Sequence, residues 1–471
     1  MGASVPRDAA ATARAPRQAP RATRSRGLSP PCTSRHRQTR HPNPTDRTDN
    51  PQAPVVIART HTPPSRWSEP VAVPSTPMAS GMSPEPIGAN AGESLPSEDA
   101  HDTEWAASPV TFLEVLAEAP PGATIELGAG TYRIPGTIEI RSHVFLSGAG
   151  PTRTRIEASG DGPALRVVGN AALALRDLTV SASDGFATNA IEAVDGALIL
   201  ERVRVTGAHG RRHRPANGEP DGPEPGYGVL IDGDVWATIT SCQFDGNDSG
   251  GICVRGRCAP TLVDIQVEGG TAAVVFAGHS SGSLTRSRCL GAAIGVLVLD
   301  RARPVLEGNV CRANTHTGIA YRLTASGLAR ANDCSDNGSA GIWVGDAATP
   351  NLEGNQCRGN RTAGIAYRRA AGGSATANAC SGGAIAGIWI SEGACPDLYA
   401  NRCEGNANGL AYTEYAGGTA NANVCGGNTL FGISVAALAS PTIEDNILDG
   451  NILGAIVDQR SSETGPLVIP N

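Results

Sequence analysis

Residues 306–321 read Leu306-Glu-Gly-Asn309-Val-Cys311-Arg-Ala-Asn314-Thr-His-Thr-Gly318-Ile-Ala-Tyr321, and this pattern returns every 22 or 23 residues as far as residue 454. A fixed period of this length is typical of stacked repeats, in which each unit buries its apolar face only against its neighbours. Two columns of repeated residues define the register: Asn309, Asn332, Asn355, Asn378, Asn401, Asn423 and Asn446, and Gly318, Gly341, Gly364, Gly387, Gly409, Gly432 and Gly454.

Each repeat has the composition of short strands joined by tight turns. Leu306, Asn309, Cys311, Ile319 and Tyr321 are expected to point inward, with Gly, Asn and Ser between them where the chain turns. No repeat sustains the apolar spacing of three and four that a helix needs. The pattern therefore predicts three short strands per repeat, which is one coil of a parallel β-helix. A leucine-rich repeat, the main competitor, needs several leucines where this repeat has one.

The polar columns fit a stack of parallel strands. Asn is disfavoured inside ordinary strands, but in a stack with strands about 4.8 Å apart each amide can bond to the next one along the column. A cysteine column runs beside the asparagines, and thiols with parallel Cβ vectors are poorly placed for disulfides. We interpret these cysteines as small buried hydrophobic residues. They are Cys289, Cys311, Cys334, Cys357, Cys380, Cys403 and Cys425.

The run Asn-x-Cys-x-x-Asn-x-x-x-Gly-Ile-x-Val or Tyr resembles the right-handed parallel β-helix repeat family, which has the pectate-lyase-like fold. The resemblance implies an all-β, right-handed, single-stranded parallel β-helix, a solenoid found in many polysaccharide-active and carbohydrate-binding proteins. The matching residues are scaffold positions, and the sequence has no motif of a particular catalytic branch. The resemblance therefore predicts the fold and leaves the activity open.

Composition excludes several kinds of chemistry. The chain has 471 residues with 58 Gly and 4% aromatic residues, and all 38 of its basic residues are Arg. Because the chain has no Lys, it cannot have a Walker-type phosphate loop, a Schiff-base lysine or a Ser-x-x-Lys nucleophile. Cys253 and Cys258 lack a matching His pair, so the sequence predicts no zinc site. We expect no metal and no cofactor.

The first hundred residues differ from the rest. Residues 1–66 carry twelve Arg against three Asp, and residues 67–104 carry seven acids and no Arg. Residues 1–103 are rich in Pro, Ala and Arg without apolar periodicity, so we predict a disordered tail. A basic arm can bind nucleic acid, but this one lacks interleaved aromatic residues and precedes an acidic segment. We therefore expect a solvated tail, and no nucleic-acid binding by the folded domain.

Targeting signals are weak. No apolar stretch follows the basic N-terminus as in a secretory signal, and no stretch approaches membrane-spanning length, so we predict no membrane span. The twelve cysteines without paired spacing favour a reducing compartment. These features favour the cytoplasm, with a transit peptide or a start codon assigned too early as the alternatives.

The coils are expected over residues 104–457, with 458–471 as a C-terminal cap or tail. A short capping helix should begin at Ser108-Pro109, with Val110, Leu113, Val115 and Leu116 as its apolar stripe. Residues 208–227 break the period as an insertion loop, and such loops often carry binding residues. Roughly 13 or 14 coils would form a rod about 65 Å long. The candidates in the loop are His209, His213 and Asp221.

One motif resembles a hydrolase nucleophile elbow. Gly278-His-Ser280-Ser-Gly282 matches Gly-x-Ser-x-Gly, which needs Ser on a sharp strand-to-helix turn. The residues that follow lead directly into another coil, and Gly282 falls in a turn column with Gly327. We therefore interpret the motif as a turn.

The outward residues of the strand after each repeated Gly are the better candidates. If the first and third residues after the Gly face inward, the second and fourth face outward. Trp343 and Trp389 then lie two coils apart, at a distance of about 9.6 Å, which is close to a disaccharide repeat. The alternative is a duplicated two-coil unit with packed Trp and a charge ladder in which Arg369 lies between two acids. The candidate ligand-binding residues are Arg322, Trp343, Asp346, Arg368, Trp389 and Glu392.

The sequence thus favours a non-catalytic β-helix scaffold that binds a polysaccharide or a protein partner along this outward face. The alternative is a polysaccharide-active lyase, glycoside hydrolase or epimerase. Acidic pairs such as Glu392 with Glu414 could serve glycoside hydrolysis, but a regular acidic column produces such pairs by repetition alone. A third reading, a substrate-recognition subunit of a degradation adaptor, lacks any recognisable adaptor domain in residues 1–107.

Overall fold

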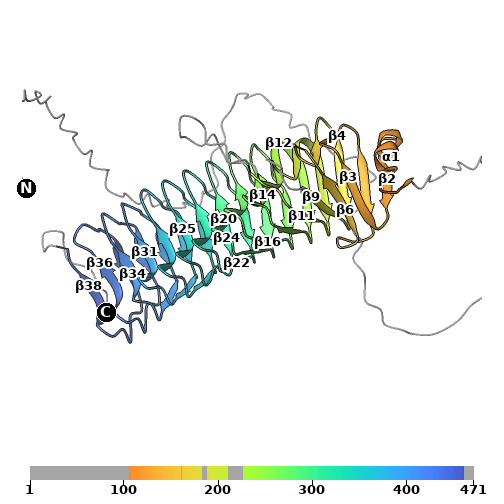
Figure 1. The fold of residues 1–471 in the computed structure, drawn as a ribbon. Helices are drawn as coiled ribbons and strands as arrows, with labels where there is room; N and C mark the ends of the chain where they lie inside the picture. Colours follow the sequence, from red (N-terminus) through yellow and green to blue (C-terminus); the bar gives the residue numbers. More distant parts are fainter. Residues whose placement is uncertain (1–104, 161, 183–187, 211–225, 461–471) are drawn as a thin grey trace, which may run out of the picture. The chain divides into compact units, whose positions relative to one another are not determined.

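The computed structural model describes residues 105–160, 162–182, 188–210 and 226–460, and all of these lie in one compact unit (Figure 1). The predicted disordered tail at 1–103 lies outside the described residues, as do most of the insertion loop at 208–227 and residues 461–471. The description that follows concerns the solenoid unit alone.

Most regular coils contain a long strand followed by two strands of three residues, and in three coils an isolated bridge at Asp333, Val424 or Ile447 takes the place of the last strand. The long strands are β10 (Ile191–Glu201), β12 (Tyr227–Thr240), β14 (Gly250–Val254), β17 (Ala272–Phe276), β20 (Ile294–Val298), β23 (Thr317–Tyr321), β25 (Ala340–Val344), β28 (Ala363–Tyr367), β31 (Ala386–Ile390), β34 (Asn408–Tyr412), β36 (Phe431–Val435) and β38 (Gly454–Asp458). The second strands are β15 (Thr261–Val263), β18 (Ser283–Thr285), β21 (Val305–Glu307), β24 (Leu328–Arg330), β26 (Asn351–Glu353), β29 (Ser374–Thr376), β32 (Asp397–Tyr399), β35 (Thr419–Asn421) and β37 (Thr442–Glu444). The third strands are β13 (Gln243–Asp245), β16 (Gln266–Glu268), β19 (Arg288–Leu290), β22 (Val310–Arg312), β27 (Gln356–Arg358), β30 (Ala379–Ser381) and β33 (Arg402–Glu404).

The N-terminal coils are less regular. Their strands are β1 (Trp105–Ala107), β2 (Ala123–Leu127), β3 (Gly130–Ile134), β4 (Ile138–Ile140), β5 (Val144–Gly148), β6 (Thr154–Ala158), β7 (Leu165–Val167), β8 (Ala172–Arg176), β9 (Thr179–Ala182) and β11 (Arg204–Thr206). The long strands β10 and β12 each extend over two faces of the solenoid, because β10 pairs with both β7 and β8 and β12 pairs with both β14 and β15.

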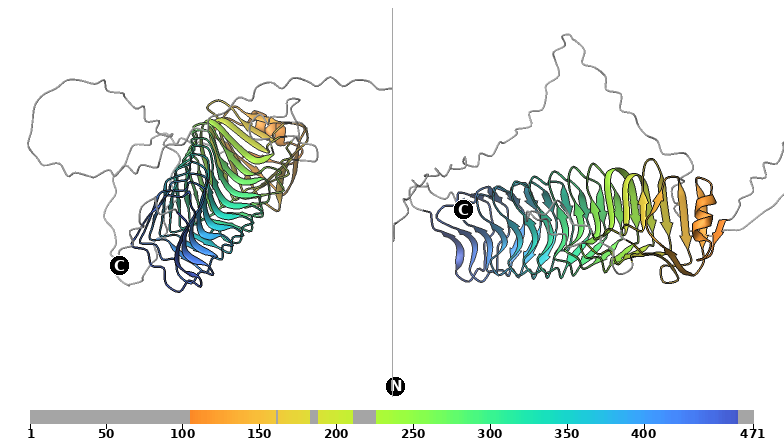
Figure 2. Two further views of the ribbon diagram at one scale, coloured as in Figure 1. Left: turned by 90° about the vertical axis from the view of Figure 1, so that its left-hand side faces the viewer. Right: turned by 45° about the horizontal axis from the view of Figure 1, so that its top comes forward.

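Every strand pairs in parallel with its equivalent in the neighbouring coil, as β23 does with β25 and β25 with β28. The pairings build a 27-stranded sheet and an 8-stranded sheet, and isolated bridges from Val310 through Asp333 to Gln356 link the latter to a 3-stranded sheet. About 14 turns stack side by side along one axis (Figure 2). The predicted right-handed parallel β-helix is therefore confirmed.

The asparagine column forms the expected ladder inside the stack. The Oδ1 atom of Asn355 accepts hydrogen bonds from the backbone N–H and from Nδ2 of Asn332, at 3.0 and 2.9 Å. Its own Nδ2 donates to the oxygen of Ala329 and to Oδ1 of Asn378, both at 2.9 Å. A second ladder begins at Asn314, whose N–H and Nδ2 donate to Asn337. Each amide therefore fixes the register of its coil against the next.

The repeated cysteines lie in the core beside these ladders, free and buried. Burial raises the pKa of the Cys334 thiol well above its usual value, and it raises that of Cys242, in an earlier coil, to about 12. Buried cysteines that form no disulfide pack as small apolar groups. The structure therefore supports the packing role predicted for this column.

A short helix, α1 (Phe112–Glu118), lies at the N-terminal end of the stack (Figure 1). Its buried residue Phe112 packs edge-on against Tyr132 with the ring centroids 5.5 Å apart. The capping helix was predicted correctly, and Val115 and Leu116 of its stripe pack against the core. The other two residues of the stripe do not, because Val110 is 90% exposed and Leu113 is 43% exposed. The helix begins only after Thr111, so Val110 lies outside it.

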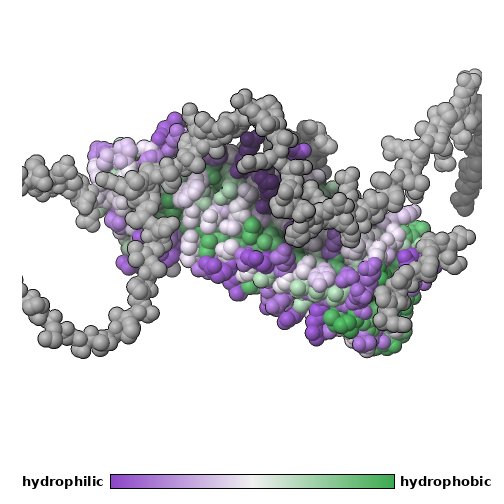
Figure 3. Space-filling model, turned by 180° about the vertical axis from the view of Figure 1, so that it is seen from behind, coloured by the Kyte–Doolittle hydropathy of each residue, from purple (hydrophilic) through white to green (hydrophobic). Residues whose placement is uncertain are grey.

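The C-terminal end of the described stack is open. β38 pairs with β36 on one side, and no described strand pairs with it on the other. Ile447, Ile452 and Leu453 are 55%, 73% and 59% exposed there. Apolar surface is visible at this end in the space-filling view (Figure 3). Among the described residues, only the N-terminal end therefore has a helical cap.

Candidate functional site

The candidate residues lie on the outer side of the long strands, as their spacing predicted. Strand pairing places Ala320, Trp343, Ala366, Trp389 and Ala411 directly beside one another in successive coils. Their chain neighbours Ile342, Val344, Ile388 and Ile390 are completely buried in the core. Because side chains alternate along a strand, the two Trp face outward, and each is partly exposed.

The two Trp alternate with interior aromatic residues. Strands that carry Ala on the outside have Tyr321, Tyr367 or Tyr412 on the inside, whereas the two Trp strands have Val344 or Ile390 there. The outward pattern therefore repeats every two coils, with Ala at the paired position on either side of each Trp.

The first unit of the site consists of Arg322, Trp343 and Asp346. The guanidinium carbon of Arg322 lies 5.7 Å from the centroid of the Trp343 ring, a cation–π contact. The far edge of that ring lies above Gly345, where a Cβ would come within 1.9 Å of the ring. Asp346 lies 3.7 Å from Arg322. The guanidinium is therefore held between an aromatic ring and a carboxylate of the next coil.

Asp346 occupies a left-handed turn, with a φ of 59°. Asp tolerates this conformation better than most residues. Its Oδ2 accepts a 3.0 Å hydrogen bond from the backbone N–H of Leu323 in the preceding coil. This N–H, followed by Arg369 and Arg322, holds the pKa of the Asp346 carboxyl below its usual value.

The second unit, two coils further, repeats the first with Arg368, Trp389 and Glu392. The guanidinium carbon of Arg368 lies 5.1 Å from the Trp389 ring centroid, and Arg368 also pairs with Glu392. The indole Nε1 donates a 3.1 Å hydrogen bond to Oγ1 of Thr413. Thr413 was not among the predicted residues, although its place four residues after Gly409 marked it as outward.

Arg369 joins the two units. It pairs with Asp346 and lies 4.0 Å from Glu392, so the alternative predicted from the sequence, a charge ladder, is present in the structure. We call the six predicted residues the Trp strip: Arg322, Trp343, Asp346, Arg368, Trp389 and Glu392. The structure brings all six together as two equivalent Arg–Trp–carboxylate units.

Of the three loop candidates, only His209 is described. Its Nδ1 lies 3.3 Å from Oδ1 of Asp248, and both side chains are about half exposed. His213 and Asp221 lie outside the described residues. His209 has no contact with the Trp strip in the described structure, so the two sets of candidates stay separate predictions.

The Gly278-x-Ser280-x-Gly282 motif does not form a nucleophile site. Ser280 is completely buried, and its hydroxyl has no hydrogen-bond partner among the described residues. The chain continues from it into β18 and not into a helix. Buried Ala occupies the equivalent inward position of later coils, as at Ala302, Ala325, Ala348, Ala371, Ala394, Ala416 and Ala439.

The variant Ser280→Ala should raise the free energy of unfolding by about 1 kcal/mol, because it removes a buried hydroxyl that has no partner. Buried Ser287 is the matched control. Its hydroxyl accepts from Ile265 N–H and donates to the oxygen of Thr285, so Ser287→Ala should destabilise the protein. Thermal and urea unfolding of both variants tests this, and a destabilised Ser280→Ala protein would show the interpretation to be wrong.

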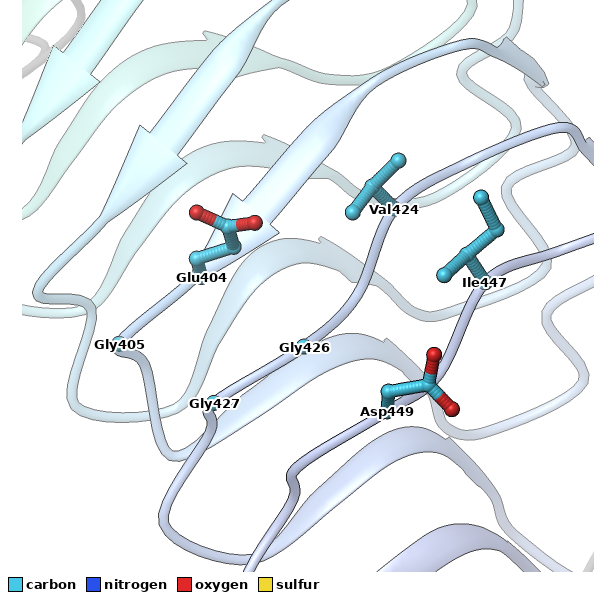
Figure 4. Close-up of a pocket in the computed structure, with 7 residues that line it drawn as sticks. All are labelled: Glu404, Gly405, Val424, Gly426, Gly427, Ile447 and Asp449. Atoms are coloured by element: carbon cyan, nitrogen blue, oxygen red, sulfur yellow. The ribbon is translucent and has the colours of Figure 1, made fainter.

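A hollow of about 340 Å³ lies near the C-terminal end of the stack (Figure 4). It exists because Gly426 and Gly427 lack side chains, and Val424 and Ile447 form its apolar lining. Glu404 lines it too, but its carboxylate is already paired with Arg402 at 2.7 Å. The hollow is separate from the Trp strip and adds no residue to it.

Two general features bear on partners. In the described residues, no group of three or more His, Cys, Asp or Glu side chains is arranged to hold a metal ion. The described chain also contains no helix of sufficient length and apolar character to cross a membrane.

Comparisons with known proteins agree with the fold. Residues 227–395 match the family model described as the right handed beta helix region. No curated protein sequence matches the chain. The periplasmic alginate epimerase AlgG aligns with a TM-score of 0.48 and 10% identity, over 75% of this chain and 83% of that chain.

Two further structures are similar at the same level. The A-module of mannuronan C-5 epimerase AlgE4 from Azotobacter vinelandii has a TM-score of 0.38 and 16% identity, over 71% of this chain and 89% of that chain. The catalytic domain of a GH87 alpha-1,3-glucanase has a TM-score of 0.39 and 13% identity, over 80% and 70%. At such identities only the fold is compared. By its strand pairing the described chain is a right-handed parallel β-helix, and residues 227–395 of it match the family model.

Proposed function

We propose that this chain is a non-catalytic β-helix scaffold that binds a polysaccharide along the Trp strip. The observation that carries the proposal is the repetition of one Arg–Trp–carboxylate unit two coils apart, at Trp343 and Trp389. The spacing of about 9.6 Å, twice the distance between strands, is close to a disaccharide repeat. Partly exposed aromatic rings are suitable surfaces for the apolar faces of sugar rings.

The Arg side chains of the strip can add polar contacts. The side chains of Arg322 and Arg368 are 48% and 36% exposed, although Nε of Arg368 is buried and has no partner among the described residues. A guanidinium has five N–H donors and can bond to a sugar hydroxyl while it stays paired. A chain that contacts both units gains affinity, because its second contact is intramolecular.

The charge arrangement favours binding over bond cleavage. A general acid for glycoside hydrolysis needs a carboxyl whose pKa is raised towards neutrality. Asp346 has the opposite property, because the Leu323 N–H and two Arg hold its pKa low. Glu392 is engaged by Arg368 and Arg369. These carboxylates act as partners that orient guanidinium groups.

The test is a panel of soluble polysaccharides on which both binding and chain cleavage are measured. Trp343→Ala and Trp389→Ala should each weaken binding about tenfold, equivalent to about 1.4 kcal/mol, and the double variant should bind more weakly still. Trp236→Ala is the matched control, because Trp236 is 60% exposed but belongs to β12, outside the strip.

The outcomes separate the candidate functions. Cleavage of any polysaccharide would favour the alternative, a polysaccharide-active enzyme of this fold. The absence of binding to every glycan would point instead to a protein partner. If Trp236→Ala lost as much binding affinity as Trp343→Ala and Trp389→Ala, binding would not involve the strip.

A further inference from the structure

Three basic side chains occupy the same position in three consecutive coils, at the turn that follows the long strand. The backbone N–H of Arg257 bonds to Gly233, that of His279 to Gly256 and that of Arg301 to Gly278, at 3.1, 2.9 and 2.9 Å. Since these bonds join equivalent positions, the three residues form one column with a spacing of about 4.8 Å. We call Arg257, His279 and Arg301 the cation column.

The column points into solvent. Each member is exposed and precedes a buried residue, which is Cys258, Ser280 or Ala302. Each also follows a turn residue with a left-handed backbone, with φ values of 72°, 67° and 57°. The backbone of the stack therefore fixes where the three side chains begin and directs them outward.

None of the three forms an ion pair among the described residues, whereas the neighbouring Arg255 bonds to Asp232 at 2.7 Å. Residues 255–303 contain six Arg and three carboxylates, a net charge of +3, in a chain whose net charge is −7. The carboxylate of Asp300, the acid adjacent to Arg301, accepts a 2.7 Å bond from Gly278 N–H. Arg257 and Arg301, two coils apart, repel each other, and an anionic ligand would remove the repulsion.

The column leads into the Trp strip. Arg301 lies in the coil directly before that of Arg322, and the coil after Arg322 carries Trp343. The next coil has Thr324 at the column position, where its N–H bonds to Asp300, and Arg322 lies two residues before Thr324 at the end of the long strand. A chain molecule that lies on the strip and continues towards the N-terminal end of the stack would meet the column.

We infer that the cation column is a second binding element, which holds carboxylate or sulfate groups of the polymer bound along the Trp strip. The inference rests on the proposed function, because it specifies the charge of that polymer and the direction in which it extends. A chain of linked six-membered sugar rings advances by close to one coil per ring, so anionic groups two rings apart can meet Arg257 and Arg301, with the His279 ring between them. Phosphates of a stacked nucleic-acid strand, spaced by about 3.4 Å along the axis, do not match the coil spacing.

The experiment uses the full chain and two polymers with the same backbone, anionic carboxymethylcellulose and uncharged hydroxyethylcellulose. The double variant Arg257→Gln/Arg301→Gln should bind carboxymethylcellulose about tenfold more weakly at low ionic strength, and the difference should shrink in high salt. Its binding of hydroxyethylcellulose should not change. The control Arg358→Gln/Arg361→Gln removes two exposed Arg with no ion pair in the described structure and gives the same net charge.

Each outcome has a defined meaning. The inference is overturned if wild type fails to bind carboxymethylcellulose, or if the two double variants lose affinity equally. It is also overturned if single-stranded oligothymidylate binds more tightly than carboxymethylcellulose and loses as much affinity in the Arg257→Gln/Arg301→Gln variant. Failure of the proposed function looks different, because Trp343→Ala/Trp389→Ala would then leave the binding of both polymers unchanged.

Discussion

The variant Asn355→Ala should lose about 4 kcal/mol or more of stability in the coils around it. The Asn355 side chain accepts two hydrogen bonds from Asn332 and donates one each to Ala329 and Asn378, at 2.9 to 3.0 Å. The residue is completely buried, so water cannot replace these partners. Each buried polar group left without a partner costs roughly 1–3 kcal/mol.

Hydrogen exchange is the sharpest measurement of this effect, because a solenoid can open locally. Amides in the coils of Asn332, Asn355 and Asn378 should exchange faster than those of the N-terminal coils. Asn351→Ala is the control. Asn351 lies in the same coil but is exposed, and it bonds only to Ser374 on the surface. If the two variants were equally stable, the ladder would not determine the stability of the stack.

The same ladder explains why the fold could be predicted from sequence. In a parallel stack, equivalent residues of successive coils lie beside one another. A residue type that pairs well with itself between two coils can therefore recur in every coil. Asn309, Cys311 and Gly318 therefore recur as columns, and the structure places these columns where the sequence predicted. The prediction needed no knowledge of distant contacts, because contacts in the stack lie within one coil or between neighbouring coils.

The site could be predicted only in part. The alternation of side chains along a strand was enough to place Trp343 and Trp389 outward. It could not show that the Trp343 ring lies over Gly345, or that Arg322 and Arg368 cover the rings. Those features depend on side-chain rotamers, which differ among coils although the left-handed turn at Asp346 recurs at Leu323 and Arg369. That Arg257 and Arg301 form no ion pair with the described residues is likewise a property of the folded surface and has no sequence signature.

The start of the helix shows a similar limit. Ser108-Pro109 indicated a helix start, and an apolar stripe was predicted from Val110 onward. In the structure the Ser108 backbone N–H donates to Oγ1 of Thr111, at 3.1 Å, and helical backbone begins only at Phe112. A turn stabilised by two short polar side chains thus displaced the boundary by a few residues.

Gly364→Ala should destabilise the protein by about 3 kcal/mol, the cost of overpacking a tightly packed interior. The backbone of Gly364 lies outside the left-handed region, so its conformation alone would accept Ala. The obstacle is steric. A Cβ at this position would lie 2.6 Å from Cβ and 2.7 Å from Sγ of Cys380, and 2.8 Å from the oxygen of Gly387. The Cβ of Cys380 and the oxygen of Gly387 are fixed to the backbone of the stack, so they cannot move without displacing a coil.

Gly354→Ala provides the matched comparison and reverses the usual expectation for glycine. Gly354 has a φ of 60°, yet nothing lies within 4 Å of its added Cβ. Ala331 and Ala377 already adopt this conformation at the same position of the adjacent coils, with φ values of 54° and 55°. The substitution should therefore cost only about 1 kcal/mol, the strain of a left-handed residue. In urea and thermal unfolding, the Gly364→Ala protein should be much less stable than the Gly354→Ala protein. The opposite order would contradict close packing of the glycine column against the cysteine column.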